Sequence, residues 1–233
     1  FSIYNAFLSK HFGKFKATIF DLCAPIIKKT TALFYEVERA FRKTALNFHY
    51  EFNVRHLTNI FQGLLVAKSD IIKEPENLVK LWVHECERIF GDRLVSAEHL
   101  AQYRNIMSDI CKSEKAFTKA NLGKYFAAPK PEFLGFGYFV QSLDDKIYDQ
   151  FPNMDLLNTR LNEALREYND TNPVMDLVLF EDAAKHLTKI TRILNADQGH
   201  ALLVGVGGSG KQSLSKLSSA ICQYNLVSIV LSS

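Results

Sequence analysis

Apolar residues recur three and four positions apart along the first part of the chain, which is the spacing of an amphipathic helix. One such stretch covers residues 19–48, with Pro25 at a break or in a first turn, and a second covers 54–67. We therefore predict a helix in each stretch. Their inward-facing residues would be Ile26, Ala32, Leu33, Val37, Ala40, Phe41, Leu57, Ile60, Phe61 and Leu64.

Two further helices are predicted from their N-cap residues. Asn77 precedes one apolar stripe, which Gly91 would end, and Ser96 precedes the next, which runs to the charged residues 112–115. Together with the first two helices, they predict a compact helical unit over 19–115. The stripes carry Leu78, Leu81, Trp82, Cys86, Ile89, Leu100, Tyr103, Met107 and Ile110.

The composition changes between residues 116 and 152, where prolines and glycines alternate with aromatic residues. A flexible tether would not carry so many rings, so we predict a connector that docks through them onto a neighbouring surface. These aromatic residues are Phe126, Phe133, Phe136, Tyr138 and Phe139.

Helical spacing returns in the last third of the chain, at residues 154–168 and 174–194. Short apolar runs at 200–204 and 226–231 predict two buried strands, with a helix between them. The inner face of the 174–194 helix would carry Leu177, Phe180, Ala184, Leu187, Thr191 and Leu194, and the last helix would bury Leu214, Leu217 and Ile221.

The composition is that of an ordinary globular protein, with 47% hydrophobic residues and 28 Lys and Arg against 25 Asp and Glu. The net charge of +3 is too small for a nucleic-acid-binding face, and the apolar runs are too short to span a bilayer. We therefore expect neither a nucleic-acid partner nor a membrane. The chain opens with Phe1 rather than Met, so we expect a piece of a longer polypeptide.

The four cysteines are widely spaced and lie in or beside apolar runs, without a C-x-x-C pair. We predict four buried free thiols, and no zinc site, because the seven histidines lack metal-ligand spacing near a cysteine pair. The thiols are Cys23, Cys86, Cys111 and Cys222.

A glycine-rich loop between a predicted strand and a predicted helix carries the clearest candidate chemistry. Its curled backbone would point N–H groups at an anionic phosphate, and Lys211 would add a cation at the positive end of the helix. We therefore predict a Walker A loop that binds ATP or ADP. The loop residues are Gly205, Gly207, Gly208, Ser209, Gly210, Lys211, Gln212 and Ser213.

One position departs from the usual pattern. Gln212 follows Lys211 where a Ser or Thr hydroxyl normally binds Mg²⁺. Ser213 is one residue later, about 100° further around the helix. Either Gln212 through its carbonyl oxygen or Ser213 is therefore a candidate Mg²⁺ ligand, and hydrolysis is less secure than nucleotide binding.

No carboxylate follows Asp197, so the acidic Walker B strand of a P-loop ATPase is absent from this sequence. We expect half of a phosphoryl-transfer site, with no complete catalytic set in the chain. Three hypotheses remain open from the residues: a nucleotide-binding segment, a helical adaptor or scaffold with a structural glycine loop, and another P-loop ATPase or kinase.

Three sequence runs, at residues 172–183, 190–194 and 199–214, resemble the opening of the fourth AAA+ module of axonemal dynein heavy chains. The Lys-Gln-Ser order after Gly210 is typical of that module. Residues 48–64 and 78–94 resemble the helical lid of the third module. The resemblance covers nearly the whole chain.

This resemblance implies a mainly α fold with a partial α/β P-loop (AAA+) sheet: a helical lid followed by the start of a large subdomain. Residues 1–18 would end the third large subdomain, 19–115 would form its lid, 116–152 the connector, and 153–233 the beginning of the fourth module.

Arg55 matches the sensor 2 arginine, which in AAA+ lids reaches the γ-phosphate of nucleotide in the same module. Taken alone, without the resemblance, Arg55 is better explained as a surface residue that pairs with Glu51.

For the parent protein, the resemblance implies an ATP-hydrolysing microtubule motor of the ciliary or flagellar axoneme. The resemblance also implies that the third and fourth nucleotide sites of that protein are regulatory. The implied partners are the neighbouring AAA+ modules, the microtubule, and dynein intermediate and light chains, in the cytoplasm and cytoskeleton.

Overall fold

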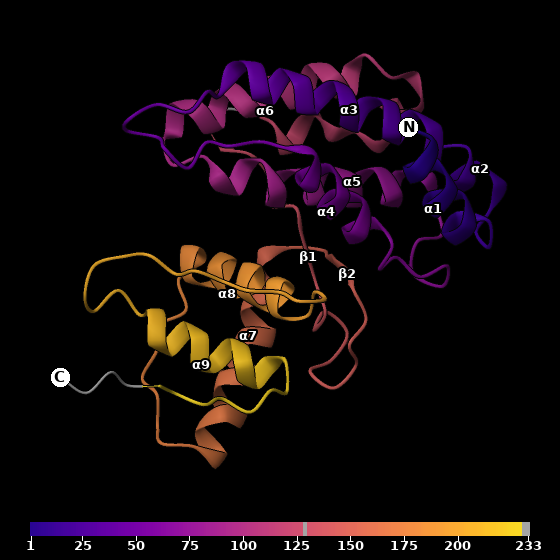
Figure 1. Cartoon of the computed structure of the whole chain (residues 1–233). Helices are drawn as coiled ribbons and strands as arrows, with labels where there is room; N and C mark the ends of the chain where they lie inside the picture. The colour runs from indigo at the N-terminus through magenta and orange to yellow at the C-terminus, as the bar shows by residue number, and fades with distance from the viewer. Residues whose placement is uncertain (128–129, 230–233) are drawn as a thin grey trace. The chain divides into compact units, whose positions relative to one another are not determined.

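The computed structural model describes residues 1–127 and 130–229, and these residues are mainly helical (Figure 1). The chain divides into two compact units, residues 1–134 and 135–233. This division falls inside the predicted connector 116–152. A mainly helical fold with a lid-like first unit was predicted and is confirmed.

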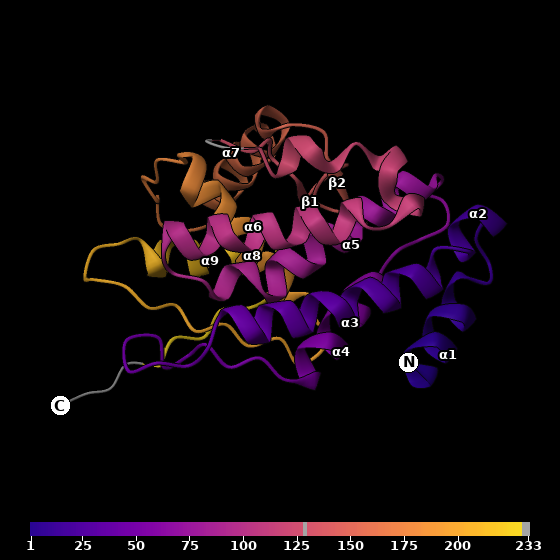
Figure 2. The same ribbon diagram turned by 90° about the horizontal axis from the view of Figure 1, so that it is seen from above.

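In the first unit, the regular elements of residues 1–127 and 130–134 are all helical. The long helix α3 packs against α1, α4, α5 and α6, and it lies close to α4 and α5 in Figure 2. The helices are α1 (Ser2–Phe12), α2 (Ala17–Phe20), α3 (Cys23–Ala40), α4 (Val54–Leu64), α5 (Pro75–Ile89) and α6 (Ala97–Lys112), with 3₁₀ turns at Gly91–Arg93, Lys115–Ala120 and Leu122–Tyr125.

Trp82 lies at the centre of this unit, fully buried on α5. Its indole Nε1 donates a hydrogen bond to Thr30 Oγ1 on α3 at 2.8 Å, and its ring packs 5.0 Å from that of Phe117. The Thr30 hydroxyl in turn donates to the carbonyl of Ile26 at 2.7 Å. A buried indole N–H needs such a partner, so this bond fixes α5 against α3.

The predicted helix 19–48 is wrong in extent, although Pro25 lies in the first turn of α3 as expected. The helix ends at Ala40 because Phe41 leaves it and turns into the core. There the Phe41 ring contacts the rings of Tyr50 and His99, at 6.3 and 5.7 Å between centroids. Tertiary packing overrides local helical spacing at this point.

The third helix begins earlier than its sequence cap indicated. Pro75 is the first residue of α5, and Asn77 lies inside the first turn rather than at the N-cap. Proline suits that position, because it has no N–H to lose and its φ is already helical. Ser96 caps α6 as predicted, through a hydrogen bond from the His99 N–H.

In the second unit, residues 135–229 form a β-hairpin and three helices. Strands β1 (Gly135–Gly137) and β2 (Asp149–Phe151) pair antiparallel, with Phe136 opposite Gln150. The helices are α7 (Met154–Thr171), α8 (Glu181–Leu194) and α9 (Lys211–Ile221), and α9 packs against both α7 and α8. The connector aromatics Phe136 and Phe139 are buried, as the sequence predicted for docked rings.

The predicted helix 174–194 begins only at Glu181. Residues 173–180 form neither a helix nor a strand, and the Asn169 side chain holds this segment by bonding both backbone groups of Met175. Leu177 and Phe180 are therefore not on the inner face of a helix, and Phe180 is 61% exposed.

The two predicted buried strands are also wrong for the residues described. Residues 200–204 and 226–229 are not in strands, and most of their apolar side chains are exposed, Leu202 at 89% and Ile229 at 90%, whereas Leu203 is half-buried. A strand needs a neighbour to take its backbone hydrogen bonds. Among residues 1–127 and 130–229, no second strand lies alongside either run. Residues 230 and 231 of the second run fall outside the described range.

All four cysteines are buried and free, as predicted. Burial raises the pKa of Cys23 and Cys222 to about 11 and that of Cys111 to about 12, and it raises the pKa of Cys86 well above the usual value.

In the described residues, no helix combines the length and the apolar character needed to cross a membrane.

Candidate functional site

The glycine loop forms an exposed turn in front of α9. Gly208 and Gly210 have φ angles of 76° and 77°, and Gly210 is the N-cap of the helix. A side chain at either position would be strained in this left-handed conformation. The two glycines thus allow the chain to reverse and to present the first turn of α9 toward the loop.

Lys211 points back into the curve of the loop. Its Nζ donates hydrogen bonds to the carbonyl oxygens of Gly205 and Val206, at 2.7 and 2.6 Å, and to Ser209 Oγ at 3.0 Å. A Cβ on Gly205 would lie 3.6 Å from this ammonium and 3.0 Å from the hydroxyl. The cation is therefore placed inside the loop, where a bound phosphate would compete for it.

The same loop provides donors for an anion. The first N–H groups of α9 have no acceptor within the helix, and the positive end of the helix dipole lies there. The loop residues from Gly205 to Ser209 are exposed, so a ligand can reach these groups. The predicted residues of the Walker A loop thus lie together, in an exposed turn at the N-terminus of α9.

Gln212 and Ser213 occupy different environments on the first turn of α9. The Gln212 side chain is exposed, whereas Ser213 is half-buried. Both provide only neutral oxygen atoms, which Mg²⁺ accepts but which supply no charge. No cluster of three or more His, Cys, Asp or Glu side chains suited to a metal occurs within 1–127 and 130–229. Each of these two residues could therefore offer a metal ion one neutral oxygen ligand.

The helix behind the loop is fixed by its apolar face. Leu214, Leu217 and Ile221 are buried, as predicted. Gly199 is also required here: a Cβ on it would lie 1.7 Å from the carbonyl oxygen of Ile193 at the end of α8. Sequence analysis assigned Gly199 no role, because this close approach to Ile193 is not visible in the sequence pattern.

Arg55 lies in the other unit, at the second position of α4, with an exposed side chain. Its backbone N–H donates to Asn53 Oδ1 at 3.0 Å. Glu51, the partner considered from sequence, lies 3.7 Å from Lys43 Nζ instead. The Arg55 guanidinium is therefore presented at the N-terminus of a helix and is accessible from solvent.

A capping box fixes the backbone that carries Arg55. Asn53 caps the helix with its side chain, and its own N–H donates to His56 Nδ1 at 2.9 Å. Burial lowers the pKa of His56 to about 4, and the positive charges of Arg93 and Arg55 act in the same direction. His56 is thus held neutral, as the acceptor role of Nδ1 requires.

Comparison with known families places both units. The family described as "P-loop containing dynein motor region D4" matches residues 175–233, and the AAA+ lid domain matches residues 26–121. The first match contains the whole glycine loop, and the second contains α4 and Arg55.

Individual relatives give the same result over 99% of the chain. It is 48% identical over 230 residues to the dynein alpha chain of the flagellar outer arm of Chlamydomonas reinhardtii. It is 39% identical to the ciliary dynein beta chain of Tripneustes gratilla and 41% identical to dynein axonemal heavy chain 17 of Mus musculus, each over 232 residues. The chain spans 5% of the length of each of these relatives.

Proposed function

This chain belongs to the dynein heavy-chain family, as a segment that joins an AAA+ lid to the P-loop of motor region D4, and on that basis we propose that residues 205–213 bind the phosphates of ATP or ADP. The observation that carries the proposal is the position of Lys211. Its ammonium lies inside the loop, bonded to two loop carbonyls, at the N-terminus of an 11-residue helix.

The chemistry of the loop favours a phosphate chain over other ligands. Glycines 205, 207, 208 and 210 keep the approach to the backbone open, and a Cβ at the last three would meet nothing within 4 Å. An anion there would accept hydrogen bonds from the backbone N–H groups and would be attracted by both the helix dipole and the Lys211 charge. The match to motor region D4 supports this use of the loop.

Magnesium would enter with the nucleotide, and Gln212 Oε1 or Ser213 Oγ would complete its coordination. A bound Mg²⁺ would neutralise charge on the phosphates. Because the chain carries no Asp or Glu after Asp197, we assign it nucleotide binding and no hydrolysis of its own.

For the first unit, the proposal assigns residues 19–115 to the lid of the preceding module and residues 1–18 to the end of that module's large subdomain. Residues 116–152 form the connector, and the fourth module starts at about 153. Arg55 would then serve as sensor 2 for nucleotide in the preceding module. Its exposure at the start of α4 and the lid match over 26–121 support this role.

In the whole heavy chain, both sites would regulate a microtubule motor of the ciliary or flagellar axoneme. The immediate partners would be the neighbouring AAA+ modules, and the microtubule and the intermediate and light chains would be partners of the whole motor. The names of the relatives, which are axonemal, ciliary and flagellar dyneins, support this placement.

The proposal is tested by Lys211→Ala in the full-length heavy chain. ADP is titrated, and hydrogen exchange is followed in peptides that cover 205–213, so that other nucleotide sites do not contribute. We expect the midpoint for protection to rise at least tenfold, since one lost charge-assisted contact to phosphate costs about 1.4 kcal/mol or more.

Lys216→Ala is the matched control, because Lys216 lies on the same helix with an exposed side chain. It should leave the midpoint unchanged. Equal ADP midpoints for the Lys211→Ala variant and the unmodified protein would remove Lys211 from its assigned role.

A further inference from the structure

The loop between β1 and β2, residues 138–148, holds the end of α9 that lies opposite Lys211. We propose that Lys146 in this loop is a positioning residue for nucleotide binding at 205–213, so that the connector and the nucleotide site are energetically coupled. This inference rests on the function proposed above. It assigns Lys146 no contact with the ligand.

The contact itself is direct. Lys146 Nζ donates a hydrogen bond to the carbonyl oxygen of Cys222 at 2.8 Å and lies 5.5 Å from the ring centroid of Tyr224. Cys222 is the C-cap of α9. A positive charge at a helix C-terminus is favourable, because the last carbonyl groups carry the negative end of the helix dipole.

The end of α9 needs this partner. The N–H groups of Gln223 and Tyr224 return to the carbonyls of Ala220 and Ser219, at 2.8 and 2.9 Å, in a Schellman motif. The carbonyl of Cys222 lies outside this pair of bonds, and Lys146 satisfies it. On the other side, Asn195 Nδ2 at the end of α8 lies 3.1 Å from Cys222 Sγ.

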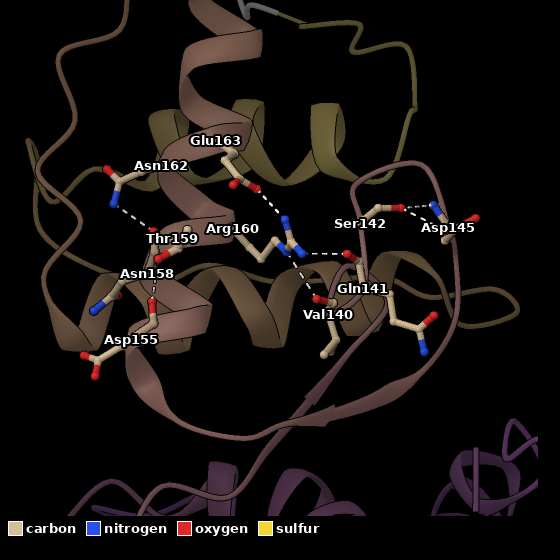
Figure 3. A network of polar contacts seen from close by, with 10 residues as sticks. All are labelled: Val140, Gln141, Ser142, Asp145, Asp155, Asn158, Thr159, Arg160, Asn162 and Glu163. Atoms are coloured by element: carbon tan, nitrogen blue, oxygen red, sulfur yellow. Dashed lines mark hydrogen bonds and ion pairs between the residues drawn. The ribbon is translucent and has the colours of Figure 1, made fainter.

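The loop that contains Lys146 is braced by the contacts of Arg160 and of Ser142 with Asp145, which Figure 3 shows. Arg160, on α7, donates from Nε to the carbonyl of Val140 at 3.2 Å and from Nη2 to that of Gln141 at 2.6 Å. The turn that precedes Lys146 is closed by a hydrogen bond from the Asp145 N–H to Ser142 Oγ at 3.0 Å. The loop is therefore fixed to α7, and the hydrogen bond of Lys146 to Cys222 connects this fixed loop to the end of α9.

The two ends of α9 are mechanically linked. A helix of 11 residues is about 16 Å long and keeps its internal hydrogen bonds when it tilts. A change in the position of Cys222 is thus passed to the first turn, where Lys211 and the N–H groups would meet the phosphates. By linkage, nucleotide binding at the first turn must stabilise the Lys146 contact by the same factor.

The experiment uses the full-length heavy chain with ADP as the probe. Hydrogen exchange is measured in peptides covering 205–213, 138–148 and the end of α9, for Lys146→Met, Lys146→Arg and Lys216→Met. We expect Lys146→Met to raise the ADP midpoint of the 205–213 peptides about fivefold, the lower end of common coupling strengths. Lys146→Arg keeps the charge and the donor and should restore the midpoint to within about twofold, and Lys216→Met should not change it.

The reciprocal effect separates positioning from simple structural support. Saturating ADP should increase protection of 138–148 in the unmodified protein and not in Lys146→Met. If Lys146→Met lowers protection at the end of α9 equally with and without ADP, and the ADP midpoint is unchanged, the inference is overturned. Lys211→Ala, measured alongside, distinguishes the failures: an unchanged midpoint there overturns the proposed function itself.

Discussion

At the scale of single residues, Gln212 is the residue that would determine how the loop binds Mg²⁺. The exposed Gln212 amide occupies the position at which P-loops usually have a hydroxyl. Ser213, the next residue, is half-buried and lies about 100° further around the helix. Under the proposed function, Lys211 and the backbone would contact the phosphates, whereas the usual hydroxyl ligand for Mg²⁺ is missing. Nucleotide binding and metal binding would then be separable properties at this site.

This separation predicts the effect of Gln212→Ser. The new hydroxyl would ligate Mg²⁺ directly, so the ratio of ATP affinity with Mg²⁺ to that without should rise roughly threefold to tenfold. Titrations that follow hydrogen exchange of 205–213 in the full heavy chain, with Mg²⁺ or with EDTA, give this ratio. Ser213→Ala is the companion variant, and a ratio unaffected by Gln212→Ser would contradict the assignment.

A second residue-scale prediction concerns pH and His56. Its pKa is about 4 in the folded chain, through burial and the nearby Arg93 and Arg55 charges, against an ordinary value of 6.5. The unfolded chain therefore binds a proton more readily between these values. This pKa difference contributes on the order of 3 kcal/mol to the free energy of unfolding. The contribution is fully present above pH 6.5 and is lost as the pH falls toward 4.

His56→Gln should flatten this dependence, because a glutamine at that position can accept the same capping hydrogen bond without titrating. Urea unfolding followed by fluorescence measures it, since Trp82 is the single tryptophan and lies in the core of the same unit. His186→Gln, an exposed site in the other unit, should leave the pH profile as it was. A profile equally steep in His56→Gln would show that another group causes it.

At the scale of elements, α7 and α9 could be predicted from their regular apolar stripes. The form of residues 174–180 and the two short strands depended on contacts with other parts of the chain. Residues 154–171 and 211–221 carry clear helical spacing and form α7 and α9. The stretch 174–180 fits both periods, and it forms neither a helix nor a strand, because bonds between Asn169 and Met175 hold its backbone instead. The strands β1 and β2 have three residues each, too few to give a pattern in sequence.

The candidate site divides in the same way. The Walker A loop was predictable, because its glycines and Lys211 are consecutive in sequence and their chemistry is local. The support at the far end of α9 was not, since Lys146 and Cys222 are separated by 76 positions and neither belongs to a motif. The left-handed conformation of Gln223 could not be predicted either, because glutamine has no preference for it.

Gln223 gives an element-scale prediction. Its φ of 58° is the conformation that ends α9 in the Schellman motif, where glycine is preferred. Gln223→Gly should therefore stabilise the end of α9 by about 0.5–1 kcal/mol, seen as slower hydrogen exchange of its amides. The same substitution at Gln102, exposed inside α6, should destabilise that helix by about 1 kcal/mol. Faster exchange at the end of α9 in Gln223→Gly would contradict the strain argument.

At the scale of the whole molecule, the chain is two units with one candidate site each: Arg55 in residues 1–134 and the Walker A loop in 135–233. If the proposed roles are correct, these sites serve different modules of one ring, and the chain carries the boundary between them. Local folding of each unit then depends on its own core, while each site is completed by neighbouring segments of the heavy chain.

The corresponding prediction is that the 233-residue chain by itself releases no measurable phosphate from ATP. It has no carboxylate after Asp197 to orient a water or to hold Mg²⁺ for attack. A phosphate-release assay on the purified chain checks this, with Lys211→Ala as the control for a contaminating ATPase. Robust turnover that Lys211→Ala abolishes would require a catalytic base that we have not identified.

The buried cysteines make both units accessible to spectroscopy. A thiol reacts as its thiolate, and a pKa of about 11 at Cys23 and Cys222 leaves almost none at neutral pH. Cys86 and Cys111 are protected in the same way. A pair of cysteines introduced on the surface, at Lys43 in one unit and Lys216 in the other, would therefore take up fluorescent dyes without removal of the native thiols. The separation of the lid and the P-loop helix could then be followed in solution as nucleotide is added.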